Sequence, residues 1–194
     1  MTQKRLDKDQ FKEFRFNEKE IDLINSFIIK YPKGRMQSAI LESLFLAQKK
    51  SGGWLPESAI AAVSEILNMP KIRVLEVATF YSMFNLEPCG NFFVQICGTT
   101  PCWLRGSDEI KKACKDHIGE ERKVSNEDIS WVEVECLGAC VNAPVVQINE
   151  EYFEDLDYSS MSEILVKLKK DQPIKKGSQI NRQSSEPIQR EKND

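Results

Sequence analysis

Histidine is almost absent from this chain, which contains one histidine among its 194 residues. That residue, His117, falls near the predicted end of a helix, where a histidine commonly just complements the helix dipole. A Rieske-type iron–sulfur centre needs two histidines on one iron, so the composition excludes it. Any metal site built by this sequence must take its ligands from other residue types.

Long apolar runs are also missing, and none approaches the roughly 20 residues that a membrane-spanning helix requires. The first 16 residues mix acidic with basic side chains. A secretory signal has an apolar core and a transit peptide is poor in acids, so neither fits. Neither charge sign dominates, because 27 lysines and arginines face 30 aspartates and glutamates for a net charge of −3. We expect no membrane span and no nucleic-acid partner.

Signatures of catalysis are lacking as well. The sequence shows no dinucleotide-binding fingerprint, no glycine-rich phosphate loop and no nucleophile beside a base. Glu133 and Glu135 could be interpreted as a general acid/base pair, but the alternating pattern around them favours a solvent-facing position for one of the two. We therefore predict no catalytic residue in this chain.

Cysteine supplies the chemistry that is present. Without a secretory signal, the six cysteines indicate a reducing compartment, where thiols bind metal more often than they form disulfides. Four of them form two close pairs, Cys97 with Cys102 and Cys136 with Cys140. Soft thiolates select zinc or an iron–sulfur cluster. The spacing alone leaves both open, because structural zinc sites also use two cysteine pairs.

Small residues beside the paired cysteines favour the cluster. Gly98, Gly138 and Ala139 let the backbone approach closely, so that its N–H groups can hydrogen-bond to cluster sulfurs and help to set the reduction potential. The remaining thiols, Cys89 and Cys114, are interpreted as incidental, although Cys89 is near enough in sequence to serve as an alternative ligand.

The apolar periodicity predicts an α+β protein. Asn17 followed by Glu20 is typical of a capping box, and four short amphipathic helical patterns follow it, which indicates a small helical bundle. Within the last pattern, packing is the favoured role for Phe80 and Tyr81. The order then becomes strand, helix, strand, strand, helix, which suits an α/β layer with one open sheet. The single helix between the cysteine pairs is predicted at about residues 104–118.

Proline and glycine at residues 85–91 interrupt the apolar pattern and predict the main domain boundary there. The expected organisation is a flexible N-terminus (residues 1–16), a helical bundle (17–86), an α/β domain (87–170) and a disordered polar tail (171–194). Both cysteine pairs follow strand ends, where ligands commonly collect in α/β sheets.

The cysteine spacing, with Pro144 after the second pair, resembles the 2Fe–2S subunit of respiratory complex I, the family of NADH–quinone oxidoreductase E-type subunits. The resemblance covers roughly residues 18–168 and includes upstream motifs such as Val77-Ala78-Thr79-Phe80-Tyr81. It implies a thioredoxin-like domain behind a helical bundle, with one 2Fe–2S cluster on Cys97, Cys102, Cys136 and Cys140. Members commonly have a glycine turn near residues 124–129, where this chain has no glycine.

The resemblance also implies a role and partners. The cluster would exchange electrons with the FMN of a flavoprotein subunit that oxidises NADH, among other peripheral-arm subunits of complex I. The chain would then be part of an NADH dehydrogenase but not catalytic alone. It would lie in the cytoplasm at the inner membrane of a bacterium, or on the mitochondrial matrix side in a eukaryote. Two alternatives stay open: the equivalent subunit of an NAD-linked hydrogenase or formate dehydrogenase, and a zinc-stapled interaction module.

Overall fold

The computed structural model describes residues 6–10 and 13–187 of the chain, and these form an α+β protein. The chain divides into two compact units, Met1–Cys89 and Gly90–Asp194. Each unit has its own apolar core. The division falls three residues after the boundary expected between residues 86 and 87. It lies inside the stretch at residues 85–91 that contains proline and glycine.

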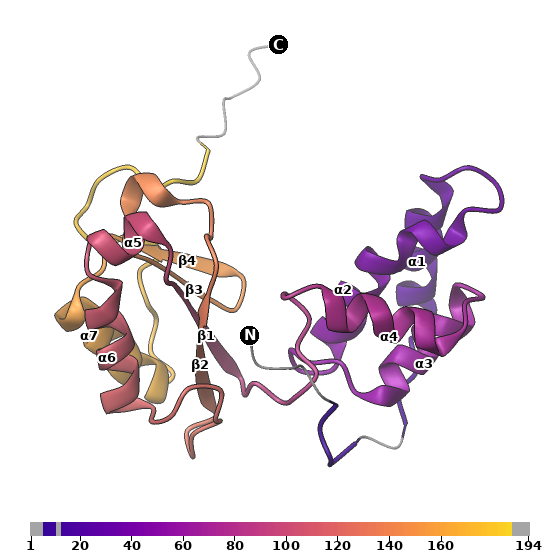
Figure 1. Ribbon diagram of the computed structural model, residues 1–194, viewed down its shortest axis with the longest axis horizontal. Coiled ribbons are helices and arrows are strands. Elements are labelled where there is room, and N and C mark those ends of the chain that lie inside the picture. Colours follow the sequence, from indigo (N-terminus) through magenta and orange to yellow (C-terminus); the bar gives the residue numbers. More distant parts are fainter. Residues whose placement is uncertain (1–5, 11–12, 188–194) are drawn as a thin grey trace, which may run out of the picture. The chain divides into compact units, whose positions relative to one another are not determined.

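The first unit is helical (Figure 1). Its α-helices are α1 (Glu18–Ile29), α2 (Ile40–Lys50), α3 (Glu57–Ile66) and α4 (Lys71–Phe80), with the 3-10 helix η1 (Met36–Ala39) before α2. The predicted capping box opens α1: the Glu20 amide donates to Asn17 Oδ1 at 2.9 Å, and the Asn17 amide donates to Glu20 Oε2 at 2.8 Å. The core takes one stripe from each helix and includes Ile24, Leu44, Ile60, Val63, Val74 and Phe84.

Two expectations for this unit are wrong. Phe80 was expected to pack, yet its side chain is 81% exposed, because it ends α4 on the face turned away from the buried Val74 and Ala78. The N-terminus, residues 1–16, was expected to be flexible, and residues 1–5 and 11–12 of it lie outside the described residues. Its described part instead packs Leu6, Phe14 and Phe16 against the helical core, because these apolar side chains lie among the charges that suggested a solvated segment.

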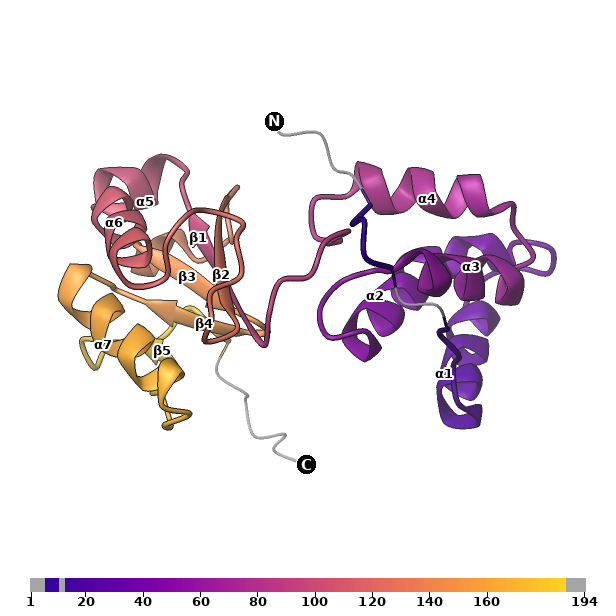
Figure 2. The same ribbon diagram turned by 90° about the horizontal axis from the view of Figure 1, so that it is seen from below.

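The second unit is a sheet with the strand order β2-β1-β3-β4-β5. Its strands are β1 (Phe92–Cys97), β2 (Ile129–Val134), β3 (Val145–Ile148), β4 (Glu151–Glu154) and β5 (Gly177–Ser178). Strand β1 is parallel to β2 and antiparallel to β3, which pairs with β4 in turn. Helices α6 (Ser107–His117) and α7 (Tyr158–Lys169) pack together on one face of the sheet (Figure 2). Between them and the strands lies a core that includes Val94, Ile96, Ile110, Val146 and Leu165.

Residues 100–117 form two helices, where the sequence predicted a single helix at about residues 104–118. Helix α5 (Thr100–Leu104) precedes α6, and Gly106, at φ +100°, separates them. That left-handed conformation is open to glycine at little cost, so the helix restarts there. Before β2, the turn without glycine is closed by a hydrogen bond from the Ser125 amide to the Ile129 carbonyl at 2.8 Å. Asp128 takes φ +61° there, as aspartate tolerates better than most residues.

The expectation of a disordered tail is also wrong for residues 171–187. Strand β5 pairs in parallel with β4, and polar contacts continue to Ser185. This segment is held by hydrogen bonds and ion pairs and not by an apolar stripe. Hydrophobic periodicity therefore gave no sign of it. Residues 188–194 of the predicted tail lie outside the described residues. None of the helices that the structure describes is long and apolar enough to cross a membrane.

Candidate metal centre

The two cysteine pairs lie at the same end of two neighbouring parallel strands. Cys97 ends β1 and pairs with Val134, the last residue of β2. Cys102 follows inside α5, while Cys136 comes two residues after β2 and Cys140 opens the 3-10 helix η2 (Cys140–Asn142). The Gly98 amide donates to the Val134 carbonyl at 3.0 Å and ties the two loops together where the strands end. Strand pairing therefore brings together thiols that are some 40 residues apart in sequence.

The thiols gather as two pairs. The Sγ atoms of Cys136 and Cys140 lie 3.4 Å apart. The thiols of Cys97 and Cys102 shift each other's pKa, and the charge of Cys97 also acts to raise the pKa of both cysteines of the second loop. Among the residues that the structure describes, no three histidine, cysteine or acidic side chains are grouped around one ion position.

Burial differs between the two pairs. Cys97 and Cys102 are each 1% exposed and pack with Ala139, Ala143 and Val145. Both cysteines of the second loop are exposed. One side of the site is thus shielded from water, and the other side opens to the surface.

Within each pair, the two thiols differ in acidity. Burial favours the neutral thiol of Cys97, but hydrogen bonds from Thr99 and from the Leu137 amide outweigh it and lower the Cys97 pKa. Burial and the interaction with the Cys97 thiol raise the pKa of Cys102 to about 12. In the second loop, the Gly138 amide lowers the pKa of Cys136, and the bond to Cys136 raises the pKa of Cys140. In each pair one thiol is therefore the more acidic of the two, and the thiolate is the form that binds metal.

Backbone and side-chain contacts hold the second loop in shape. Gly138, at φ +82°, donates its amide to Cys136 Sγ at 3.4 Å, the kind of bond expected from the small residues beside the cysteines. Tyr152 donates its hydroxyl to the Leu137 carbonyl at 2.6 Å. In the first loop, Thr99 Oγ1 lies 3.3 Å from Cys97 Sγ. Sequence reasoning did not single out Thr99 or Tyr152; the position of Thr99 between paired cysteines was a usable signal, whereas Tyr152 gave none.

Gly98 leaves room for the side chain of Glu133 on the neighbouring strand β2. A Cβ atom at this position would lie 1.8 Å from Glu133 Oε1. Glu133 is itself engaged by Lys111, with Nζ 3.3 Å from Oε1. This ion pair gives Glu133 a structural contact, while Glu135 lies exposed on the chain beyond β2.

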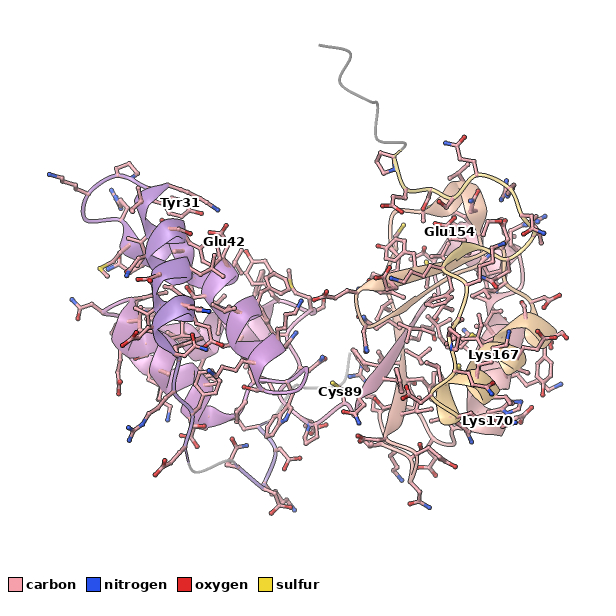
Figure 3. The ribbon with its side chains drawn as sticks, turned by 180° about the vertical axis from the view of Figure 1, so that it is seen from behind. Tyr31, Glu42, Cys89, Glu154, Lys167 and Lys170 are labelled. Carbon is pink, nitrogen blue, oxygen red and sulfur yellow. The ribbon has the colours of Figure 1, made fainter. Side chains whose placement is uncertain are left out.

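The remaining cysteines and the histidine belong to other elements than the two loops. Cys89 belongs to the helical unit, where its Sγ lies 3.4 Å from the Gly53 carbonyl (Figure 3). Cys114 is buried in α6, and burial raises its pKa to about 12. His117 is the last residue of α6, the helix-end position that the sequence predicted.

The donor set fits a binuclear iron–sulfur cluster. Such a cluster takes four thiolates, two on each iron, and its sulfurs accept backbone N–H bonds. Paired thiols, a buried side and an amide already directed at a cysteine sulfur provide these features. With the sheet and its two helices, they define a thioredoxin-like iron–sulfur protein.

The comparisons with known proteins lead to the same class. The pattern of the thioredoxin-like 2Fe-2S ferredoxin family matches residues 24–169. The E-type subunit of NADH-quinone oxidoreductase from Rickettsia bellii (strain RML369-C) is 52% identical over 160 residues, covering 81% of this chain and 96% of that protein. The chain therefore belongs to the thioredoxin-like 2Fe-2S ferredoxin family and, within it, to the family of NADH-quinone oxidoreductase E-type subunits.

More distant relatives extend the comparison. The mitochondrial NADH dehydrogenase [ubiquinone] flavoprotein 2 of Dictyostelium discoideum is 42% identical over 182 residues, covering 93% of this chain and 74% of that protein. Among solved structures, an NAD+-reducing NiFe hydrogenase in the air-oxidised state matches with a TM-score of 0.57 and 19% identity. That match covers 68% of this chain but only 23% of the hydrogenase chain, and it shows a shared fold.

Proposed function

We propose that this chain is the electron-transfer subunit of an NADH–quinone oxidoreductase, holding one 2Fe–2S cluster on Cys97, Cys102, Cys136 and Cys140. The observation that carries the proposal is the convergence of two thiol pairs at adjacent strand ends, one pair buried and the other exposed. A bound cluster of this type supplies a one-electron donor and acceptor.

The residues of this chain bind the cluster and keep it rigid. Strands β1 and β2 hold the two loops, and the hydrogen bond from the Gly98 amide to the Val134 carbonyl fixes the spacing of the loops. The buried side, with Ala143 and Val145, excludes water. The Gly138 amide stabilises negative charge on the Cys136 sulfur. A rigid, half-shielded site suits electron transfer, because little has to reorganise when an electron enters or leaves.

The electron partner belongs to another subunit. The sequence has no dinucleotide fingerprint, and an NADH molecule gives up two electrons together as a hydride. The relatives carry names of NADH-oxidising complexes. We therefore assign NADH and FMN to a flavoprotein subunit that faces the exposed Cys136 and Cys140, with further peripheral-arm subunits around both. The assembly would be peripheral to the bacterial inner membrane on its cytoplasmic side, or on the matrix side in a mitochondrion.

The alternatives have weaker support. The hydrogenase likeness, at 19% identity, concerns the fold alone, whereas relatives with 52% and 42% identity bear names of NADH dehydrogenase subunits. No separate observation supports the alternative of a formate dehydrogenase subunit. The family match favours an iron–sulfur cluster over a zinc staple.

Two measurements test the proposal. Iron and acid-labile sulfide in protein purified anaerobically should each approach about two per chain, the content of a 2Fe–2S cluster. Stoichiometric zinc without labile sulfide would overturn the cluster. Mass spectrometry of the chains that co-purify from the native source should identify a flavoprotein; hydrogenase or formate dehydrogenase subunits in its place would select one of the alternatives.

A further inference from the structure

The C-terminal segment at residues 177–185, here called the strap, reaches the second thiol loop. It starts as β5 beside β4 and then passes the 3-10 helix η2, which begins at Cys140. Arg182 Nη2 donates to the Val141 carbonyl at 2.9 Å, and Asn142 Nδ2 donates to the Gln183 carbonyl at 2.8 Å. The strap therefore contacts the two residues that directly follow Cys140.

A buried carboxylate joins the strap to the same loop. Glu154, which Figure 3 labels, lies at the end of β4 and is 1% exposed. Its side chain accepts from Asn142 Nδ2 at 2.6 Å and from the Ser185 amide at 3.0 Å, and also from the Ser185 hydroxyl. Because burial makes an unsatisfied carboxylate costly, these donors are held firmly in place. Asn142 is thus fixed from two sides, and Cys140 lies two residues before it.

A charge pair completes the contact. Arg182 binds Asp155 through two of its nitrogens, with Nε 2.9 Å from Oδ2. The Asp155 side chain is only 3% exposed, and the Arg182 guanidinium, with the Ser178 hydroxyl, lowers the pKa of Asp155, so the carboxylate is charged at neutral pH. Arg182 also lines a surface hollow together with Arg105, Cys140 and Val141. A balanced pair of charges therefore lies beside one of the proposed ligands.

We infer that the strap is part of the cluster site and that Arg182 and Asp155 are positioning residues: the strap fixes the loop of Cys140, and the charge pair sets the reduction potential of the cluster. This inference rests on the proposed function, in which Cys140 is a cluster ligand.

The charge pair predicts shifts of opposite sign. Reduction adds one negative charge to the cluster, and a nearby cation stabilises that charge while an anion destabilises it. Arg182→Gln leaves the buried Asp155 carboxylate uncompensated and should lower the potential. Asp155→Asn leaves the Arg182 cation uncompensated and should raise it. If the substitutions merely loosened the loop, there would be no reason for the reduction potential to shift in opposite directions in the two variants.

The test is a redox titration of the full-length, cluster-loaded protein and its variants, monitored by visible absorption. At a fixed potential, the ratio of reduced to oxidised protein should fall about tenfold in Arg182→Gln and rise in Asp155→Asn, where tenfold corresponds to about 59 mV for a one-electron couple. Lys176→Gln is the matched control. It removes one cation from the adjoining chain, and it breaks an ion pair with Glu151, at the opposite end of β4 from Asp155. Its ratio should stay within about twofold of the parent.

The outcomes separate cleanly. Equal shifts in Arg182→Gln and Lys176→Gln, or shifts of one sign in Arg182→Gln and Asp155→Asn, would overturn the inference. If Arg182→Gln fails to fold, Arg182→Lys decides with Asp155→Asn: the retained charge should keep the ratio of reduced to oxidised protein within about threefold of the parent, and a tenfold fall in that ratio would count against the charge pair. A parent protein without the 2Fe–2S spectrum would instead refute the proposed function, which is a different result.

Discussion

At the scale of single residues, each proposed ligand interacts with the other cysteine of its pair. Cys136 Sγ lies 3.4 Å from Cys140 Sγ, and the thiols of Cys97 and Cys102 shift each other's pKa. Serine keeps the shape of cysteine but replaces a soft thiolate with a hard oxygen. We expect a serine at any one of the four positions to remove most of the visible absorption of the cluster and most of the bound iron, measured after anaerobic purification.

Two substitutions outside the loops serve as controls for the ligand set. Cys114 is buried in the core of the second unit, and His117 ends α6. Alanine at either position should leave the visible spectrum as it is in the parent, although Cys114→Ala will cost some stability by opening a small cavity. An intact cluster in Cys136→Ser, or a lost one in His117→Ala, would refute the assignment of ligands.

Gly98 offers a second prediction at this scale. Its added Cβ would collide with the Glu133 carboxylate, which is also bound to Lys111. We expect Gly98→Ala to lower the free energy of unfolding by about 1 kcal/mol, because Glu133 must move and its ion pair with Lys111 must weaken. In a Glu133→Ala background the same substitution should cost clearly less, since the obstacle is gone. Urea titrations of the four proteins in this cycle provide the measurement, and additive costs would show that the clash has another origin.

At the scale of elements, helix α7 depends on its first residues. Asp157 caps it: Asp157 Oδ1 accepts from the Ser160 amide at 2.7 Å, and Ser160 Oγ accepts from the Asp157 amide at 2.9 Å. The amide and the hydroxyl of Ser160 lower the pKa of Asp157 below its usual value. Asp157→Ala should therefore destabilise the second unit by about 1 kcal/mol at pH 7, as thermal or urea unfolding would report.

The sign of the pH dependence follows from the lowered pKa. The carboxylate contributes its stability above the unfolded-state pKa of about 3.9 and loses it as the pH falls through the lower folded-state pKa. The difference between parent and Asp157→Ala should thus shrink below about pH 4. Asp157→Asn is the matched control, because asparagine caps a helix without titrating. A difference between the parent and Asp157→Ala that does not change between pH 7 and pH 3 would contradict this account.

Most elements could be predicted from the sequence because their signals are local. The Asn17 capping box and the repeated apolar stripes lie within a turn or two of the helices that they define. The errors have other causes. Leu6 lies in a charged stretch whose composition conceals a tertiary contact. Phe80 follows the helical pattern but falls on the outer face of α4. Strand β5 is only two residues long and forms through pairing with β4, far away in sequence.

The same division applies to the candidate site. The paired spacing of the four cysteines is a local signal, and strand pairing brings the two pairs together as expected. The supporting contacts come from afar: Tyr152 reaches the Leu137 carbonyl across 15 residues, and Arg182 reaches Val141 across 41. A tyrosine in a short strand and an arginine in a polar tail have no periodicity or spacing that marks such roles. They become visible only when the chain is folded.

At the scale of the whole molecule, the two units have separate cores and all four proposed ligands lie in the second. We expect a fragment of residues 87–194 to fold and to bind iron on its own. A fragment of residues 87–170 lacks the strap, so it should bind the cluster less firmly and lose it faster on exposure to air. Iron content and the decay of visible absorption measure both effects. If the longer fragment cannot hold iron even after reconstitution, the units are not independent.

The isolated chain should not act as an NADH oxidase, and this prediction follows from counting electrons. NADH delivers two electrons as a hydride, whereas a 2Fe–2S centre accepts one, and a flavin can take two and release them singly. Dithionite, a one-electron donor, should reduce the purified chain and produce a paramagnetic signal of about one spin per cluster. NADH alone should leave the visible spectrum unchanged under anaerobic conditions. Adding the NADH-oxidising flavoprotein should make NADH an effective reductant, provided that the cluster potential is high enough. Rapid bleaching by NADH without that partner would mean that this chain contains a hydride-accepting site of its own.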